Sequence, residues 1–396
     1  MRIAILGLAA TCYGNRTCLW NLLPQLAQLD RSNEYEVFLP PENIFDLDLD
    51  QPNFRIHRSG RVPTSSVRRL LWEQLFLPWL LWAKGVDVVY TAHNLTLFLS
   101  PIPSVVVVHN IEPFFAGKFP NSLRLRTRLW LLRLLTSLSL RKSWRIIAVS
   151  DWEREFLVEC LHIPDDKIVM AYHGVTEGFR PLTPGAAADL DEGLGLERPY
   201  ILCVTRLAGY GNLGNLAKAY ASLAKQGKVT MPLVVAGGVW DSGYVGSVRR
   251  FLEREGCAEQ VKFVGYVPYE QMPLLIGNAE CFVFPSRLES CSNVLIEALA
   301  CGAPILCSQR RPMTDICGDA AVFFDGEDPG DIADKLLQVL SDQSLRDTLA
   351  RRGPARAARF SWREGAEKLL EVFEQLSPVR DTAKDGAAAV RSNGKS

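Results

Sequence analysis

The sequence lacks the features that mark several common classes of protein. Its ten cysteines include no C-x-x-C pair and no histidine spacing typical of zinc, so neither a redox motif nor a structural zinc site is predicted. No run of 18 or more apolar residues occurs, and no segment is expected to span a membrane. Lys and Arg number 44, as do Asp and Glu, which leaves no net field to attract nucleic acid. We predict a cytoplasmic protein with reduced, mostly buried cysteines and no nucleic-acid partner.

Length and periodicity indicate two domains. The 396 residues exceed the size at which one hydrophobic core usually stops growing. Short β-rich runs alternate with helical patterns in two consecutive series, which is typical of parallel strands joined by crossover helices. The first series has expected strands at 2–6, 37–39, 86–90, 104–108 and 145–149, and expected helices at 16–30, 67–84, 122–142 and 151–162. The second series has expected strands at 200–204, 233–236, 261–264, 281–284, 304–307 and 321–323.

These series predict an α/β fold of two doubly wound, Rossmann-like domains that face each other across a cleft. We place the N-terminal domain at 1–175, a Gly/Pro-rich linker at 176–199 and the C-terminal domain at 200–358. A last helix, 359–377, is expected on the surface or crossing back to the first domain, and a disordered tail is expected at 378–396. Doubly wound sheets bind ligands beyond the carboxyl ends of their strands, so the chemistry is expected in the cleft.

The strongest local signal follows the expected strand 281–284. Glu289 lies in the loop after this strand, and Glu297 lies about one turn inside the next helix, so both can face the cleft. Between them, the amides near Asn293 and Val294 belong to a helix N-terminus, which can bind an anion such as a diphosphate. The carboxylates could accept hydrogen bonds from sugar and ribose hydroxyls. An ordinary capped helix with two solvated acids fits the spacing equally well, and both interpretations stay open from the residues alone.

The run from Pro285 to Pro304, Pro-Ser-Arg-Leu-Glu-Ser-Cys-Ser-Asn-Val-Leu-Ile-Glu-Ala-Leu-Ala-Cys-Gly-Ala-Pro, resembles the signature of retaining GT-B glycosyltransferases of family 4. The shared features are two glutamates with seven residues between them, a small-residue helix and Gly-x-Pro. The resemblance implies that Glu297 holds the ribose of a nucleotide-diphosphate sugar and that Glu289 holds the transferred sugar. This sequence departs from the family at 290–292, where Ser-Cys-Ser replaces a glycine-rich segment.

Two further segments of the second half match the family in order. Arg206 follows the expected strand 200–204 and resembles the arginine that contacts the donor diphosphate. The family usually has a lysine five residues later, where this sequence has Gly211, so one phosphate-neutralising cation is missing. A lysine at position 211 is expected to raise turnover, provided that the loop can point it into the cleft. The alternative is that Arg16 already supplies this charge when the cleft closes, in which case a lysine at position 211 should gain little. Gly265 and Tyr266 resemble the turn on which the donor base stacks, and an ordinary strand with a tight turn fits the segment equally well.

In the first half, Gly14 and Arg16 resemble the loop that reaches the donor phosphates across the cleft, with Arg16 where the family often has a second glycine. His109 follows a fully apolar strand. A lone histidine is more often structural, but catalytic groups collect at strand ends, and the resemblance implies that His109 lies beside the acceptor and the transferred sugar. Asn110 replaces the usual aspartate.

Two other polar residues of the first half, Ser150 and His173, are given structural roles or a place in the cleft. Ser150 is expected to cap the helix that follows it. His173 is expected to be structural or to line the cleft.

Metal binding is not expected. Asp46-Leu-Asp48 formally contains the D-x-D motif with which GT-A enzymes hold a metal at the donor diphosphate. It lies in an alternating Asp/Leu loop of the first half, with no nucleotide fold nearby. Helix amides and Arg206 can offset the phosphate charge instead, so we predict no metal and no cofactor.

The segment 118–145 contains eight Lys and Arg and no acid, interleaved with leucines and Trp130. Basic helices rich in Trp and Leu bind anionic membrane surfaces. A helix packed on the sheet with its basic face in water has the same pattern, and the sequence leaves both open. Peripheral attachment to the inner face of the membrane is therefore a hypothesis, and a lipid-linked acceptor would account for it.

The predicted function is a retaining, metal-independent glycosyltransferase that moves a hexose from a nucleotide-diphosphate sugar to a glycan or lipid-linked acceptor. One alternative is a catalytically silent GT-B subunit that binds and regulates a partner transferase, which the residues at 110, 211 and 292 favour. A dinucleotide oxidoreductase is a further alternative. The predicted catalytic residues are His109, Glu289 and Arg206. The predicted donor-binding residues are Gly14, Arg16, Arg206, Gly265, Tyr266, Glu289, Asn293, Val294 and Glu297.

Overall fold

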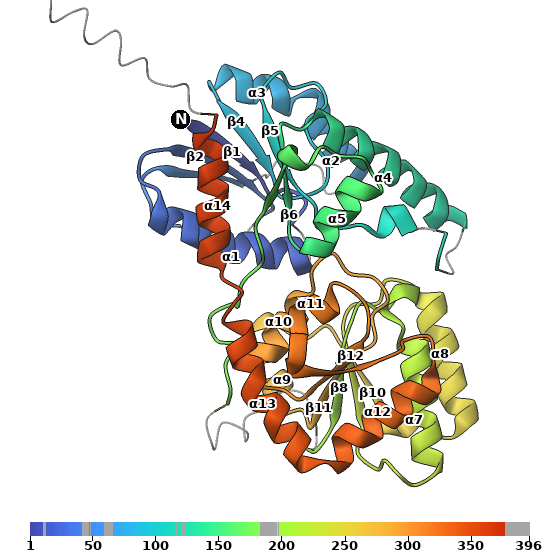
Figure 1. Cartoon of the computed structure of the whole chain (residues 1–396). Helices are drawn as coiled ribbons and strands as arrows, with labels where there is room; N and C mark the ends of the chain where they lie inside the picture. Colours follow the sequence, from blue (N-terminus) through green and yellow to red (C-terminus); the bar gives the residue numbers. More distant parts are fainter. Residues whose placement is uncertain are drawn as a thin grey trace, which may run out of the picture.

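The computed structural model describes residues 1–10, 13–41, 47, 49–58, 66–115, 117–119, 123–182, 196 and 198–376. These residues form two α/β domains, each a parallel sheet covered by helices on both faces (Figure 1). The predicted fold class is confirmed. None of the helices in this part of the chain combines the length and apolarity needed to cross a membrane.

The N-terminal sheet has seven parallel strands in the order β3-β2-β1-β4-β5-β6-β7. Its strand order reverses direction between β1 and β4, and ligands of doubly wound sheets bind at such switch points. The strands are β1 (Arg2–Leu6), β2 (Glu34–Leu39), β3 (Phe54–Arg58), β4 (Val88–Thr91), β5 (Ser104–Val107), β6 (Arg145–Ala148) and β7 (Ile168–Met170). The helices are α1 (Tyr13–Leu29), α2 (Ser66–Leu75), α3 (Leu77–Ala83), α4 (Leu123–Lys142) and α5 (Asp151–Glu159).

The C-terminal sheet has six parallel strands in the order β10-β9-β8-β11-β12-β13, with its switch point between β8 and β11. The strands are β8 (Ile201–Val204), β9 (Leu233–Ala236), β10 (Val261–Gly265), β11 (Cys281–Phe284), β12 (Ile305–Ser308) and β13 (Ala321–Phe324). The helices are α7 (Leu213–Lys225), α8 (Ser242–Glu255), α9 (Met272–Gly277), α10 (Asn293–Ala300), α11 (Met313–Cys317), α12 (Pro329–Ser341) and α13 (Gln343–Ala357).

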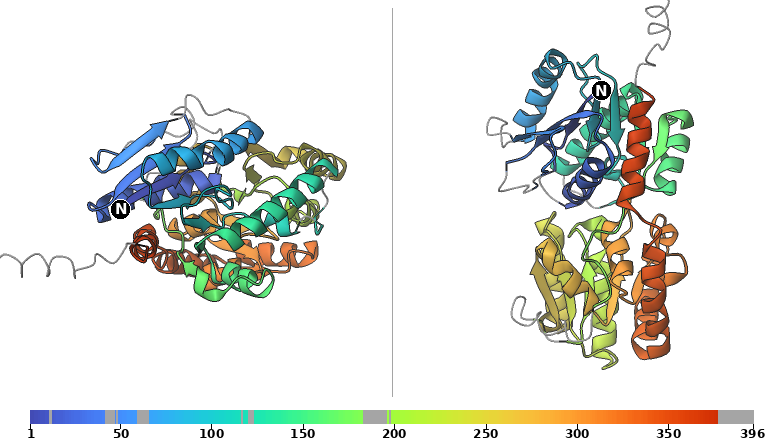
Figure 2. Two further views of the ribbon diagram at one scale, coloured as in Figure 1. Left: turned by 90° about the horizontal axis from the view of Figure 1, so that it is seen from above. Right: turned by 90° about the vertical axis from the view of Figure 1, so that its left-hand side faces the viewer.

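The last helix, α14 (Trp362–Glu374), crosses back to the N-terminal domain. It runs beside α1 in two views of the molecule, whereas α13 stays on the other domain (Figures 1 and 2). Its apolar face, which includes Leu369 and Phe373, joins the core formed by α1 and the first sheet. The expected crossing is therefore confirmed, and α14 ties the two domains together.

Three expectations about secondary structure were wrong. One helix was expected at 67–84, but α2 and α3 are separate, because Pro78 has no amide hydrogen and its ring would clash with the carbonyl of Gln74 in a continuous helix. The edge strands β3 and β7 were not expected. The first alternates apolar and basic residues, and the second has three residues, so neither has the continuous apolar run that marked the buried strands.

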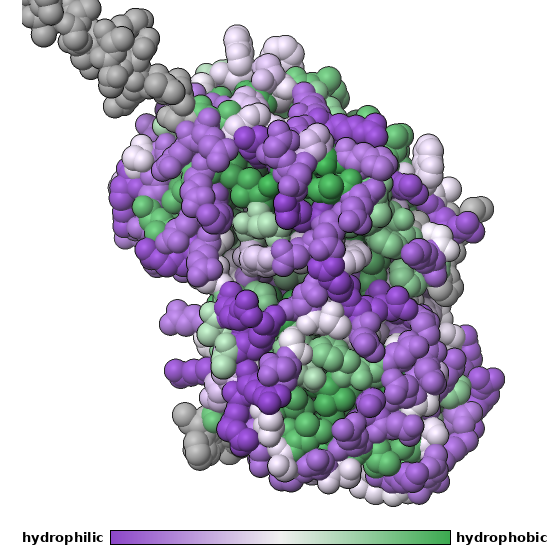
Figure 3. All heavy atoms as spheres, in the orientation of Figure 1, coloured by the Kyte–Doolittle hydropathy of each residue, from purple (hydrophilic) through white to green (hydrophobic). Residues whose placement is uncertain are grey.

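The cysteines of the described part of the chain form no disulfide, as expected. Seven of these nine thiols are buried, one is half-buried and Cys160 is exposed. On the face shown in Figure 3, hydrophobic atoms gather in recesses that hydrophilic atoms surround. The linker residues 183–195 and 197, and the tail from 377 onward, lie outside the described residues.

Candidate active site

The turn that enters α10 offers unpaired backbone donors. Ser292 precedes the helix, and its side chain makes no capping hydrogen bond. Its carbonyl accepts from the amides of Leu295 and Ile296, at 3.1 and 3.2 Å. The amides of Asn293 and Val294 have no acceptor among the described residues. Two first-turn amides at the positive end of a helix are therefore available to an anion.

Two glutamates flank this turn, as the sequence predicted. Glu289 accepts a 2.7 Å hydrogen bond from the Ser286 hydroxyl, and Glu297 accepts one of 2.6 Å from the Tyr269 hydroxyl. Burial raises the pKa of Glu289 to about 7, although Ser286 and the charge of Arg206 oppose the shift. Burial also raises the pKa of Glu297 to about 7. Both carboxyl groups are thus close to half-protonated near neutral pH, and a ligand that donates hydrogen bonds would favour their charged form.

Arg206 follows β8 at the switch point and lies against aromatic side chains. Its guanidinium donates to the Tyr210 hydroxyl at 3.0 Å and lies over the ring of Trp240, 5.0 Å from the centroid. Arg128 of α4 lies over the same ring at 5.8 Å. The charge of Arg206 also lowers the pKa of Glu112, which burial raises. A cation held this way, close to Glu289 and to the neighbouring domain, is available to a phosphate group in the cleft.

The backbone at Gly211 has no room for a side chain. A Cβ there would lie 2.3 Å from the carbonyl oxygen of Arg206 and 2.8 Å from Oγ1 of Thr205. Both distances are far below van der Waals contact. The expectation that a lysine at this position could restore a missing cation is therefore wrong, because the loop is closed around the glycine.

His109 follows β5, and the side chain of Asn94 shapes the turn on which it lies. The amides of His109 and Asn110 both donate to Oδ1 of Asn94, at 3.1 and 3.3 Å, and Asn94 donates in return to the carbonyl of Asn110 at 2.5 Å. Burial lowers the pKa of His109 well below its usual value, and His173 and His93 add to the shift. The imidazole is therefore neutral, and its Nε2 has no hydrogen-bond partner among the described residues.

His173 joins the two domains beside His109. Its Nδ1 donates to Oδ1 of Asn293 at 2.5 Å, its ring stacks on Trp362 at 5.0 Å, and the centroid of the His109 ring is 5.2 Å away. Burial lowers the pKa of His173 to about 4, although Asn293 opposes the shift. His173, expected to be structural or to line the cleft, is buried and positions the first residue of α10.

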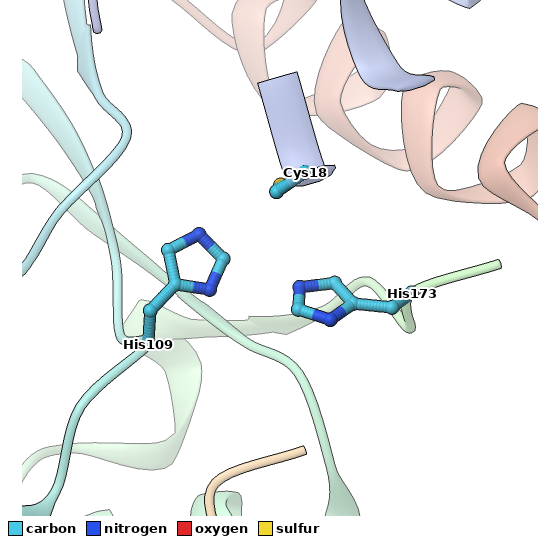
Figure 4. A group of neighbouring side chains, drawn as sticks. All are labelled: Cys18, His109 and His173. Carbon is cyan, nitrogen blue, oxygen red and sulfur yellow. The ribbon is translucent and has the colours of Figure 1, made fainter. Parts of the chain in front are cut away.

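Cys18 of α1 completes a group that could hold a metal ion. One ligand atom from each of Cys18, His109 and His173 lies within 4.8 Å of the others, and the two imidazoles point toward each other below the thiol (Figure 4). Neutral imidazoles and a thiolate are ligands of Zn²⁺, which could keep a fourth position open here. Burial raises the pKa of the Cys18 thiol to about 12, so metal binding would have to displace a tightly held proton.

The other predicted donor-binding residues lie on the first turn of α1 and at the end of β10. Gly14 and Arg16 lie on the first turn of α1, with the guanidinium of Arg16 5.7 Å from the ring centroid of Trp20. Gly265 ends β10 with φ +70, and Tyr266 beside it is 56% exposed. Of the D-x-D motif, positions 46 and 48 lie outside the described residues.

Direct contacts hold the two domains together around this site. Ser150 donates to the carbonyl of Ser290 at 2.6 Å, and Glu155 pairs with Arg311. Ser150 also accepts from the Glu153 amide and caps α5, as expected. These polar contacts between the domains hold the loop before α10 against the end of β6.

Sequence reasoning missed Tyr269, Trp240, Asn94 and Cys18. Tyr269 bonds Glu297 and Thr176 and also interacts with Thr17 of α1. None of these residues belongs to a motif, because each acquires its partner from a distant part of the chain. The only available signal was that Trp240 and Tyr269 are aromatic residues that come soon after expected strand ends.

Two parallel sheets, with a helix turn that has unpaired amides, an arginine and two acids at the carboxyl end of the second sheet, are the arrangement expected of a GT-B glycosyltransferase. Solved structures of similar fold cover nearly the whole chain. Sucrose-phosphate synthase from Thermosynechococcus elongatus matches 95% of this chain and 99% of its own, with a TM-score of 0.74 and 19% identity. HepE from Anabaena, in complex with UDP and glucose, matches 95% and 100%, with a TM-score of 0.72 and 17% identity.

Family models match both halves of the chain: Glycosyltransferase Family 4 over residues 14–178 and Glycosyl transferases group 1 over 189–356. The O-antigen chain mannosyltransferase B of Escherichia coli is 27% identical over 73% of this chain and 75% of its own length. The D-inositol 3-phosphate glycosyltransferase of Thermobispora bispora is 30% identical over 61% and 59%. The chain belongs to the group 1 glycosyltransferases of family 4 type. These comparisons do not favour a silent regulatory subunit.

Proposed function

We propose that this glycosyltransferase transfers a hexose from a nucleotide-diphosphate sugar to a glycan or lipid-linked acceptor, with retention of anomeric configuration and without a metal ion. The observation that carries the proposal is the pair of unpaired amides at the start of α10, flanked by Glu289 and Glu297 and approached by Arg206. The diphosphate lies at the amides, and Glu297 accepts hydrogen bonds from the ribose. Glu289 accepts hydrogen bonds from the transferred sugar.

In the transfer step, the acceptor oxygen forms a bond to the anomeric carbon on the face that the diphosphate leaves. The bond between this carbon and the phosphate oxygen breaks, and the acceptor proton passes to a diphosphate oxygen. The helix amides and Arg206 stabilise the charge that develops on the leaving group. His109 is neutral, because burial lowers its pKa, and we place it beside the acceptor and the transferred sugar.

The partners follow from the same proposal. The acceptor binds the N-terminal domain, and a lipid-linked acceptor would be reached from the inner face of a membrane. Unpaired cysteines are compatible with a reducing, cytoplasmic location.

A panel of nucleotide-sugars tests the proposal. Mannosyl donors come first, because several relatives are mannosyltransferases. A bound donor should raise the melting temperature, and the Glu297→Gln variant should lose most of that shift. Glu270→Gln is the matched control, because Glu270 is exposed and near Tyr269.

Donors that bind are then offered acceptors with and without chelator, and the anomer of the product is assigned by NMR. Donor binding without transfer or hydrolysis would contradict the proposed activity. An inverted product would contradict retention.

A further inference from the structure

Exposed apolar side chains gather on one layer of the N-terminal domain. Among the described residues, fifteen large hydrophobic side chains are exposed, and eleven of them belong to α2, α3, α4 and nearby loops. The three tryptophans of this set are each about two-thirds exposed, at 65 or 66%. We call this layer the docking face, and it comprises Leu71, Leu75, Phe76, Trp79, Leu80, Trp82, Leu99, Trp130, Leu131, Leu134 and Leu138.

The elements of the docking face cover the same side of the sheet. α3 packs Leu77 and Leu81 against β1 and β4, and α4 packs Leu140 against β5 and β6. The loop between them is fixed to α4, because the amide of Thr96 donates to the Ser139 hydroxyl at 2.7 Å. α2, α3 and α4 all belong to the N-terminal domain, and Arg128 of α4 also lies over the ring of Trp240 of the C-terminal domain (Figure 2).

The composition of α3 is unusual for a helix in contact with water. Its sequence, Leu-Pro-Trp-Leu-Leu-Trp-Ala, contains no polar side chain, although only one side of the helix faces the core. Trp79, Leu80 and Trp82 project from the other side. Surface helices normally place charged residues there, and a contiguous exposed apolar area marks an interaction site.

The charge around these apolar residues has one sign. α4 carries exposed Arg126, Arg128, Arg133, Arg141 and Lys142, and no acid occurs from 118 to 145. The only acid of α2 and α3 is Glu73, which is buried. The docking face is therefore apolar and basic in a protein whose net charge is zero.

We propose that the docking face binds the surface of an anionic lipid bilayer. Indole rings favour the headgroup level of a bilayer, and guanidinium groups favour its phosphates, so the charge and the apolar surface are satisfied together. A second copy of the chain would bring two basic α4 helices together, which like-charge repulsion opposes. The proposal rests on the membrane attachment included in the proposed function. It adds the apolar side chains of α2 and α3 to the membrane contact, which the sequence had placed in the segment 118–145 alone.

Vesicle sedimentation with the full chain tests this assignment. The protein should bind phosphatidylcholine vesicles that contain about one third phosphatidylglycerol, bind pure phosphatidylcholine far less, and lose binding as salt rises. Brominated lipid should quench tryptophan fluorescence when the docking face is inserted.

Matched variants separate the docking face from the rest of the surface. Trp79→Ser with Trp82→Ser, or Arg126→Glu with Arg141→Glu, should reduce vesicle binding about tenfold or more. Arg351→Glu with Arg359→Glu makes the same charge change on exposed positions of the C-terminal domain and should leave binding unchanged. Each variant is also checked for its melting temperature and for donor affinity without vesicles.

If the docking-face variants lose vesicle binding but keep their donor affinity, the result supports the docking face, whichever acceptor the enzyme uses. Donor affinity that is absent from the wild-type protein would count against the proposed function alone. A wild-type protein that ignores anionic vesicles would overturn the docking face, as would test and control variants that bind equally. Light scattering that reveals a dimer disrupted by the tryptophan variant would also overturn it, because the face would then join two copies.

Discussion

Replacing Gly211 with lysine should damage the enzyme instead of activating it. The new Cβ would be placed 2.3 Å from the Arg206 carbonyl oxygen, and a contact with backbone cannot be relieved by rotating a side chain. Overpacking of this kind costs about 1 to 3 kcal/mol. For a domain of this size, each kcal/mol lowers the melting temperature by about 2 to 4 °C, so a loss of about 2 to 12 °C is expected.

Turnover should fall together with stability, because the atom that must move belongs to Arg206, the proposed diphosphate ligand. Gly246→Lys is the control: it lies in α8 of the same domain, and its Cβ would be 3.5 Å from the flexible end of Arg250. This control should keep its stability and turnover within small changes. Differential scanning fluorimetry and initial rates of nucleotide release measure both quantities. A Gly211→Lys protein with wild-type stability and higher turnover would refute the steric reasoning.

Three further predictions concern charge in the cleft. Donor affinity should rise with pH from about 6 to about 8, because the pKa values of Glu289 and Glu297 are raised to about 7 and donor hydroxyls favour the carboxylate, so binding releases protons. Calorimetry across this range should give a weaker dependence for Glu297→Gln, and an affinity independent of pH would contradict the assignment. Turnover should survive EDTA, since backbone amides and a guanidinium can offset the phosphate charge. If EDTA abolishes turnover of the wild type and Zn²⁺ restores it, while EDTA has no effect on the Cys18→Ser variant, the Cys18 group holds an essential metal. Arg16→Ala should lower turnover about tenfold to a hundredfold with little change in donor affinity, whereas the exposed Arg31→Ala should have no effect; equal behaviour of the two would remove Arg16 from the site.

The arrangement of domains could be predicted from the sequence because buried parallel strands leave a strong local signal. Runs such as Cys281–Phe284 and Leu233–Ala236 are apolar throughout, and each is buried along its whole length. The edge strands β3 and β7 gave no such signal, because edge positions do not require an apolar residue at every place. The separation of α2 from α3 could have been predicted from Pro78, since the constraint of proline is local.

The candidate site divides in the same way. The spacing of Glu289, Asn293 and Glu297 is short enough to be read along the chain, because all three belong to one strand-loop-helix unit. The contact between His173 and Asn293 joins residues 120 positions apart, and Tyr269 reaches Glu297 from another loop. Such partners follow no local pattern.

By itself, the sequence determined the two sheets, the helix turn that can bind a phosphate and the acids beside it, since hydrophobic periodicity and helix termini are properties of neighbouring residues. Only the tertiary structure decided that Gly211 has no room for a lysine and that Cys18, His109 and His173 converge. It also decided that the apolar helix α3 and the basic helix α4 cover the same side of the first sheet. Each of these depends on where separate elements pack against one another, and packing is a property of the whole chain.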